Sequence, residues 1–388
     1  MLKRIFLIFL YSLSLHSGAQ IVVGAARVNA YLPFLKDKRV ALAVNQTSTI
    51  AGRHLVDTLQ ALGVNIVAVF APEHGFRGDH GAGESVSSGY DAQSGIAVYS
   101  LYGKNKKPSN QHMMSIDIVV FDIQDVGARF YTFISTLHYL MEACAENNKP
   151  LLLLDRPNPN GNYIDGPVLD TNFRSFVGMH PVPVVHGLTV AEYAQMINGE
   201  RWLNKNKECN LAVITCLNYT HSATYVLPIK PSPNLPSQQS IRLYPSLCFF
   251  EGTNVSLGRG TDKPFEQIGA PWFLTGKVKF TPKDIPGVAV NPPYANQLCY
   301  GYDLSDSLHH FSDGLNLDYL IEFYQNAPDK KNFFNSFFDK LAGDSVLREQ
   351  IISGKTSQEI KQSWQKDLEA YQKIRKQYLL YPDFDEGR

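Results

Sequence analysis

Short apolar runs alternate with polar loops and amphipathic stretches through the first half of the chain. Four of these runs are almost continuously apolar and are predicted to be buried strands, at residues 40–44, 64–70, 116–121 and 151–154. Between them, residues 54–62 and 134–145 repeat apolar positions every three or four residues, which is typical of helices packed on a core. Buried strands that alternate with helices predict an α/β fold whose mostly parallel sheet is covered on both faces.

The second half of the chain has a different pattern. Residues 227–240 contain four prolines in fourteen positions, too many for a helix or a central strand, so this segment is predicted to be a linker or an ordered crossover. A mixed region follows, and residues 357–378 place apolar side chains along one helical stripe. Because the chain has 388 residues and domains average roughly 100–200, two domains are expected.

The composition narrows the class of protein. Lys plus Arg and Asp plus Glu each number 36, so no net charge draws the chain to nucleic acid. Hydrophobic residues make up 44% of the chain, which excludes a disordered protein. The 22 phenylalanines and 20 tyrosines supply rings suited to packing and to the faces of sugars.

Residues 1–19 are predicted to be a signal peptide rather than part of the fold. Lys3 and Arg4 precede an apolar run at 5–15, and small residues follow at 17–19. Such a short run cannot cross a hydrocarbon core that needs about twenty residues. We therefore expect an exported, soluble protein of the periplasm or cell envelope.

The five cysteines are scattered and form no CxxC pair; they lie at positions 144, 209, 216, 248 and 299. Most have apolar neighbours, which favours packing roles. Cys209 and Cys216 stand at opposite ends of a predicted strand, too far apart to bridge each other without a bend.

Each predicted strand runs directly into polar residues. Asn45 follows the first strand, Glu73 and His74 the second, Asp122 the third and Asp155 the fourth. In an open α/β sheet, ligands bind at the edge where the carboxyl ends of the strands lie. We therefore expect four motifs that are distant in sequence to form one cleft.

Glu73 is the leading catalytic candidate. A carboxyl group that is partly desolvated by aromatic neighbours can have a raised pKa and act as a general acid. The alternative is that Glu73 caps a helix or pairs with Arg77. Asp122 and Asp125 occupy the equivalent position after another strand, where Asp125 is better explained as a turn or helix cap.

Two further segments combine polar side chains with stiff or glycine-rich backbone. Residues 155–159 (DRPNP) form a stiff turn, for which a structural salt bridge is the alternative to a site. Residues 251–261 (EGTNVSLGRGT) bring together an acid, an arginine and three glycines, which allow close approach to a ligand. Glu192 lies three residues after Thr189, the spacing of a capping box, so a structural role is favoured.

Other chemistries lack their sequence signatures. The chain has no GxGxxG, P-loop, HExxH or GxSxG motif. His74 and His80 are close in sequence but have no clear third ligand for a metal. We expect neither a cofactor nor a metal.

Five motifs occur in order along the chain: EHGFRG at 73–78, DIQDVGARFYT at 122–132, LDRPNP at 154–159, PSPNLP at 231–236 and EGTNVSLGRGT at 251–261. Together with YLLYP at 378–382, they resemble the exo-β-N-acetylmuramidase (NamZ) family, long catalogued as a domain of unknown function. The resemblance covers essentially the whole mature chain. It implies release of terminal N-acetylmuramic acid from the non-reducing end of peptidoglycan fragments.

The resemblance also implies an architecture, a Rossmann-like domain and a smaller α+β auxiliary domain with the site between them. The predicted boundaries are a signal peptide at 1–19, the catalytic domain at 20–235 and the auxiliary domain at 236–388. Glu73 corresponds to the family's proposed catalytic glutamate. A site between domains favours Glu251 as the second acid, facing Glu73 across the cleft, over Asp122; this second assignment is our own.

Glycoside hydrolysis usually needs two carboxyl groups across the scissile bond. The lactyl carboxylate of N-acetylmuramic acid also suits an arginine fork, and four arginines of the motif loops should make the cleft locally positive. The residues predicted to bind substrate are Asn45, His74, Arg77, Asp125, Arg129, Tyr131, Arg156, Asn158, Asn254 and Arg259.

Two alternatives would use the same cleft. A non-catalytic muropeptide-binding protein would have the same arginines without turnover. An esterase or amidase acting on cell-wall material is disfavoured by the lack of a serine elbow or metal triad. The expected partners are peptidoglycan-derived sugars, with no nucleic acid and no stable membrane insertion.

Overall fold

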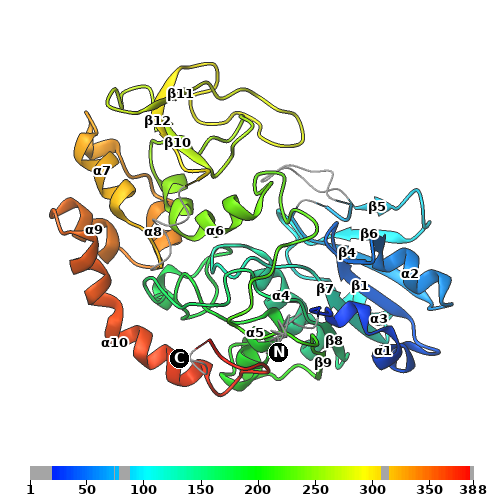
Figure 1. Cartoon of the computed structure of the whole chain (residues 1–388). Coiled ribbons are helices and arrows are strands. Elements are labelled where there is room, and N and C mark those ends of the chain that lie inside the picture. The colour runs from blue at the N-terminus through cyan, green and yellow to red at the C-terminus, as the bar shows by residue number, and fades with distance from the viewer. Residues whose placement is uncertain (1–19, 74, 78–87, 307–313, 385–388) are drawn as a thin grey trace, which may run out of the picture.

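A seven-stranded sheet forms the centre of the first part of the chain in a computed structural model that describes residues 20–73, 75–77, 88–306 and 314–384 (Figure 1). Its strands lie in the order β5-β6-β4-β1-β7-β8-β9. Their bounds are β1 Val40–Val44, β4 Ile66–Ala71, β5 Gly89–Tyr90, β6 Ala97–Ser100, β7 Ile118–Asp122, β8 Leu151–Leu154 and β9 Leu211–Ile214. Neighbouring strands are parallel except for β5 against β6. Without β5, this is the doubly wound order of Rossmann folds.

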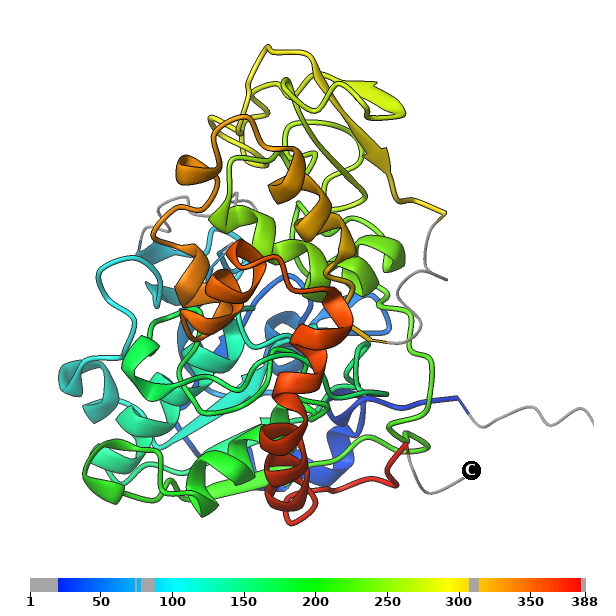
Figure 2. The same ribbon diagram turned by 90° about the vertical axis from the view of Figure 1, so that its left-hand side faces the viewer.

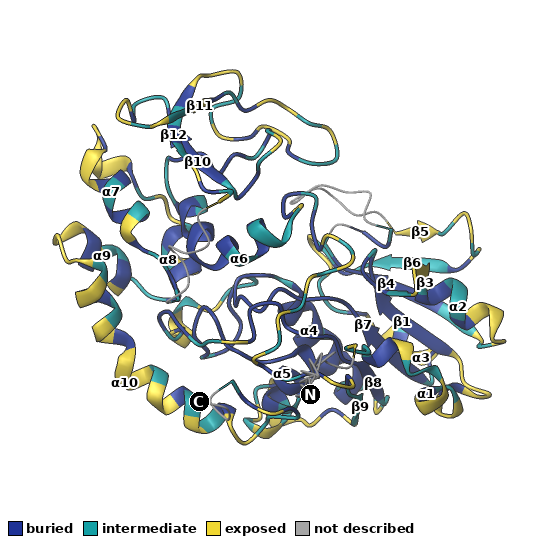
Figure 3. Ribbon diagram, viewed as in Figure 1, coloured by how far each residue is buried: buried dark blue, intermediate teal, exposed yellow. Residues whose placement is uncertain are grey.

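Both faces of the large sheet are covered, as the continuous apolar runs predict. In β1, the side chains of Val40, Leu42 and Val44 pack on one face with α1 (Val28–Leu35) and α2 (Leu55–Ala61). Ala41 and Ala43 point to the other face, which is covered by α4 (Phe133–Glu146) and α5 (Val190–Gly199). The central strands β1, β7 and β8 are accordingly buried along their length (Figure 3). Two-sided burial explains why they show no alternation of polar and apolar residues.

The second part of the chain is smaller and mixed. It begins with α6 (Gln238–Leu247), which runs into the 3-10 turn η4 (Cys248–Gly252). A three-stranded antiparallel sheet follows in the order β10-β12-β11, with bounds Gln267–Ala270, Cys299–Asp303 and Val278–Phe280. The remaining helices are α7 (Asp318–Asn326), α8 (Phe338–Ala342), α9 (Val346–Ile352) and α10 (Ser357–Arg375). Short elements in the first part are β2 (Thr49–Ile50), β3 (Arg53–His54) and α3 (Asn110–Met114).

The C-terminal helix and tail return to the first domain, as Figure 2 shows for the long α10. The Tyr371 hydroxyl donates to the carbonyl of His186 at 2.7 Å. Beyond α10, the Tyr381 hydroxyl donates to Asp155 Oδ2 at 2.6 Å, and the Leu380 amide donates to Glu192 Oε1 at 2.8 Å. The YLLYP segment therefore holds the loop that follows β8 and the first turn of α5.

The predicted α/β fold class is confirmed, and several elements match closely. The strands predicted at 40–44 and 151–154 coincide with β1 and β8, and the helix predicted at 134–145 lies within α4. The proline-rich segment is an ordered crossover, with a bridge between Ser232 and Leu235 before α6 begins.

The five cysteines are buried and free, in agreement with packing roles. No helix among the described residues has the length and apolar character needed to span a membrane. The predicted signal peptide, residues 1–19, lies outside the described residues.

Candidate functional site

A cavity of about 490 Å³ lies between the two parts of the chain. The first domain contributes Glu73, which follows β4, and Thr132, which precedes α4. The second part contributes Glu251 and Arg259 from the turn and loop after α6. The structure therefore brings the two preferred catalytic candidates, one from each side, to a single cavity.

Glu73 is held by hydroxyl groups of the first domain. The Thr132 hydroxyl donates to Glu73 Oε2 at 2.8 Å. The Tyr102 hydroxyl also hydrogen-bonds to this carboxyl group, and burial together with the charge of Glu73 raises the pKa of Tyr102. Arg77, the alternative partner considered from the sequence, instead binds Asp91 at 2.8 Å and Asp57 at 3.4 Å. Two hydroxyl groups thus contact the Glu73 carboxyl group at the cavity wall.

Glu251 is paired with Arg259. The guanidinium group of Arg259 binds Glu251 Oε1 through Nη2 and, at 3.2 Å, through Nε, and it also lies 4.9 Å from the ring centroid of Phe265. The side chains of Glu251 and Arg259 remain 27% and 22% exposed. The predicted glycine-rich loop therefore presents an ion pair to the cavity rather than a lone acid.

Aromatic rings form much of the cavity wall. The lining includes Tyr102, Phe130, Tyr131, Phe133, Phe176, Tyr244, Phe265 and Phe337. The Tyr131 hydroxyl donates to the carbonyl of Pro231 at 2.9 Å, so the proline-rich crossover fixes this ring from behind. Rings beside carboxylates are suited to a ligand with an apolar face and a polar edge.

Other predicted site residues form a closed network at the carboxyl ends of β1 and β7. Asp122 is fully buried and accepts from Arg156 Nε at 2.6 Å and Nη2 at 2.9 Å. Asn45 Oδ1 accepts from the amide of Thr47 at 3.0 Å, and the Thr47 hydroxyl accepts from the amide of Gln124. These side chains bind one another, and none of them lines the cavity.

Asp125 and Asn158 also serve the local backbone. Asp125 Oδ1 accepts from the Gly127 amide at 2.7 Å, which confirms the predicted turn role. Burial raises the pKa of Asp125 to about 7. Asn158 donates to the carbonyl of Leu188 at 2.9 Å. Thr189 and Glu192 form the predicted capping box at the start of α5.

Arg129 links the two domains by hydrogen bonds to backbone carbonyls of both. It is fully buried, and its guanidinium group donates to four backbone carbonyls, those of Pro167, Val182, Leu341 and Ala342. The backbone carbonyl of Asn254 accepts a hydrogen bond from the Tyr294 hydroxyl at 2.8 Å, which fixes Asn254 within its loop. His74, also predicted to bind substrate, lies outside the described residues.

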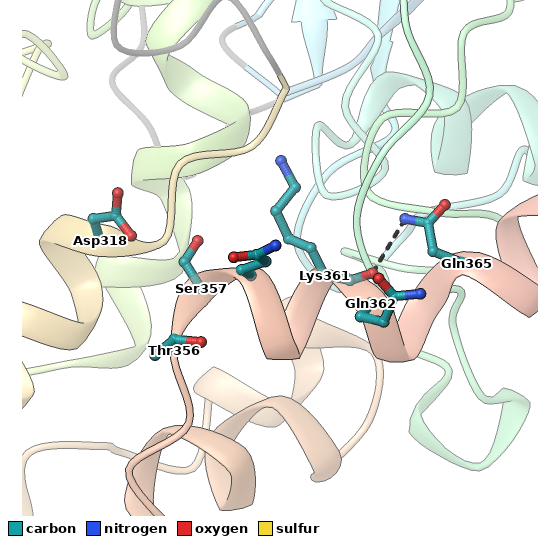
Figure 4. Close-up of a pocket in the computed structure, with 7 residues that line it drawn as sticks. Asp318, Thr356, Ser357, Lys361, Gln362 and Gln365 are labelled. Atoms are coloured by element: carbon teal, nitrogen blue, oxygen red, sulfur yellow. Dashed lines mark hydrogen bonds between the residues drawn. The ribbon is translucent and has the colours of Figure 1, made fainter.

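A second hollow of about 520 Å³ between α7 and α10 has a different lining (Figure 4). Its side chains include Asp318, Ser357, Lys361 and Gln365, and none of the described residues that line it is aromatic. Lys361 is paired with Asp165 at 3.1 Å. Within the ranges that the structure describes, no group of three His, Cys, Asp or Glu side chains could hold a metal.

Sequence reasoning missed three residues around Glu73 and the cavity. Thr132 is the last residue of the motif at 122–132. No sequence pattern indicates that its hydroxyl contacts Glu73, which lies 59 positions earlier. Tyr102 and Phe176 lie in irregular loops, where neither periodicity nor a motif selects them. Only the approach of distant segments in the fold identifies them.

Comparison with known proteins agrees with this arrangement. The family described as exo-beta-N-acetylmuramidase NamZ matches in two parts, its N-terminal domain at residues 40–239 and its C-terminal domain at 242–381. The peptidoglycan beta-N-acetylmuramidase NamZ of Bacillus subtilis (strain 168) is 39% identical over 373 residues, covering 90% of this chain and 89% of that protein.

Two crystal structures of DUF1343 family proteins from Bacteroides fragilis NCTC 9343 have the same fold. The first has a TM-score of 0.86 at 46% identity and covers 94% of this chain and 100% of its own. The second has a TM-score of 0.79 at 30% identity and covers 93% and 99%. Because both family domains match in order along the chain, the chain belongs to the exo-β-N-acetylmuramidase (NamZ) family of glycoside hydrolases.

Proposed function

We propose that this protein releases terminal N-acetylmuramic acid from the non-reducing end of peptidoglycan fragments, with Glu73 and Glu251 as its carboxyl pair. The observation that supports this most directly is that the two glutamates, one from each domain, line one ring-walled cavity. Two carboxyl groups on opposite sides of a sugar are the usual machinery of glycoside hydrolysis.

The two glutamates have different partners, which suggests a division of roles. Glu251 is bound to the guanidinium of Arg259 and acts as the anion, either activating water or stabilising positive charge on the sugar ring. Glu73 is contacted by the hydroxyls of Thr132 and Tyr102, which orient its carboxyl group. With Glu251 as the anion, Glu73 is the group that donates a proton to the leaving oxygen.

The substrate also carries a lactyl carboxylate, which the cavity must accommodate. Of the four arginines predicted to bind it, Arg77, Arg129 and Arg156 are engaged by protein acceptors away from the cavity lining. Arg259 lines the cavity and is bound to Glu251. Arg259 thus remains the arginine whose loss should affect the substrate directly.

A chromogenic aryl N-acetyl-β-muramide tests the activity. We expect the purified protein to release the chromophore and to prefer this substrate over the aryl N-acetyl-β-glucosaminide. A chain that binds the muramide, for example by fluorescence titration, but releases no chromophore would be a binding protein, and the proposal would be wrong.

We also propose that the protein is exported, because residues 1–19 have the charge and apolar pattern of a signal peptide and the proposed substrate is cell-wall material. Expression of the full chain in a bacterial host, followed by mass spectrometry of the periplasmic fraction, should yield a chain that begins near Gln20. An uncleaved chain confined to the cytoplasm would contradict export.

A further inference from the structure

Lys106 lies on the loop between β6 and α3 and contacts a ring of the cavity wall. On this loop, Tyr102 lines the cavity and contacts Glu73. Four residues further on, Lys106 Nζ lies 4.4 Å from the ring centroid of Phe176, another lining residue. The Phe176 ring is itself positioned by Tyr139, with ring centroids 6.3 Å apart in a stacked arrangement. An ammonium group is therefore held against a packed ring that itself lines the cavity.

Lys106 differs from its neighbour Lys107 in its ion pairing. Lys107, the next residue, binds Glu142 at 2.7 Å and Glu146 at 2.9 Å. Across the described part of the chain, no carboxylate forms an ion pair with Lys106. A cation on a ring face keeps its full charge, since the ring offers a quadrupole and not an anion.

An anionic substrate needs such a charge here. The described cavity lining contains two glutamates and one arginine, and that arginine is paired with Glu251. A lactyl carboxylate that entered this lining would meet an arginine already paired with Glu251, so a further cation next to the lining would stabilise it.

We propose that Lys106 determines specificity by binding the lactyl carboxylate of the terminal N-acetylmuramic acid. This inference rests on the proposed function and adds a residue that its motifs do not contain. In the complex, the sugar lies against the ring wall, Glu73 reaches the leaving oxygen, and the ammonium group of Lys106 pairs with the lactyl oxygens. A glucosaminide lacks the lactyl group and gains nothing from Lys106.

Lys106→Met tests this pairing, because methionine keeps the unbranched chain over Phe176 and removes the charge. Three ligands are compared: the aryl N-acetyl-β-muramide, its lactyl methyl ester and the aryl N-acetyl-β-glucosaminide. We expect kcat/KM for the muramide to fall about three- to thirtyfold, while values for the uncharged ester and the glucosaminide stay within about twofold. Lys106→Arg should retain most of the preference, and added salt should weaken it in the wild type.

Lys104→Met is the matched control, since Lys104 is an exposed lysine on the same loop. An equal loss on all three substrates, or a loss in the Lys104 variant as large as in the Lys106 variant, would overturn the proposal. If the wild type turns over neither glycoside, the proposed function fails. Binding of free N-acetylmuramic acid against N-acetylglucosamine, measured by calorimetry for wild type and Lys106→Met, then decides the role of Lys106 separately: unchanged discrimination would overturn it.

Discussion

The polar side chains around Asp122 and those around Glu73 stand at the same carboxyl edge of the large sheet, but their surroundings differ. Asp122 and Arg156 are 0% and 3% exposed and bind each other through two hydrogen bonds. Glu251 and Arg259 form a comparable ion pair, yet 27% and 22% of their side chains remain exposed at the cavity. The two ion pairs thus share their chemistry, whereas only the pair of the second domain is open to a ligand.

This difference separates side chains that maintain the fold from those available for chemistry. In a doubly wound sheet, the crevice between β1 and β7 is the usual place for a ligand. Here that crevice is filled by Asn45, Thr47 and Asp122 with their protein partners. The cavity is lined instead by residues that follow β4, β6 and β7, and the second domain supplies the opposite wall. Because this buried network fills the usual crevice, the cavity that a ligand can enter lies beside Glu73.

The largest effect is expected at Glu73. Glu73→Gln keeps the shape of the side chain and its hydrogen bond from Thr132 but removes the proton that the leaving group requires. We expect kcat to fall about 10²–10⁴-fold, the range for lost acid–base catalysis, with unchanged thermal unfolding. Release of chromophore from the aryl muramide measures it. A variant with more than about a tenth of the wild-type rate would remove Glu73 from this role.

Asp122 should behave in the opposite way, through stability rather than rate. Asp122→Ala leaves the guanidinium of Arg156 buried without its carboxylate, and breaking a buried pair costs about 3–5 kcal/mol. Urea unfolding measures the loss, and activity per folded molecule should change little. The double variant Asp122→Ala, Arg156→Met is the control, because it removes the stranded charge and should recover stability. A folded Asp122→Asn enzyme as slow as Glu73→Gln would make Asp122 the catalytic acid.

Asp125 is a second buried carboxyl group that should affect stability rather than rate, and its effect should depend on pH. Burial raises its pKa to about 7, so the folded state binds more protons than the unfolded state between about pH 4 and 7. Its contribution to stability is complete below about pH 4 and is lost as pH rises toward 7. Asp125→Asn cannot ionise, so the variant should gain about 1–3 kcal/mol relative to wild type between pH 5 and 8. Parallel stability curves would show that Asp125 does not titrate in this range.

Much of the fold was predictable because burial on both faces leaves a clear signal in the sequence. β1 and β8 are continuous apolar runs with the predicted bounds, and α4 follows the predicted spacing. Asp125 and Glu192 were assigned to turn and cap roles from local spacing, and local hydrogen bonds confirm them. Such features depend on neighbours within a few residues.

The site was only partly predictable, because partners distant in sequence decide it. Glu73 and Glu251 were chosen and do share a cavity, whereas Asn45, Asp122 and Arg156 were placed with them on sheet position alone. Whether an edge residue points to the network or to the cavity depends on the loops that cover it. Arg129 shows the same limit: its acceptors at Leu341 and Ala342 lie more than two hundred residues away.

The smallest expected effect concerns Thr132, a positioning residue that acts through Glu73. Its hydroxyl donates to Glu73 Oε2 at 2.8 Å, and Thr132→Val removes this donor while keeping the branched shape. A hydrogen bond of this kind contributes about 0.5–1.5 kcal/mol, so kcat should fall about two- to tenfold. Because Thr132 orients the acid and does not hold the sugar, KM should remain unchanged. Thr136→Val, whose hydroxyl donates to the Thr132 carbonyl inside α4, is the matched control and should leave kcat intact. A loss confined to KM would instead place the Thr132 hydroxyl on the substrate.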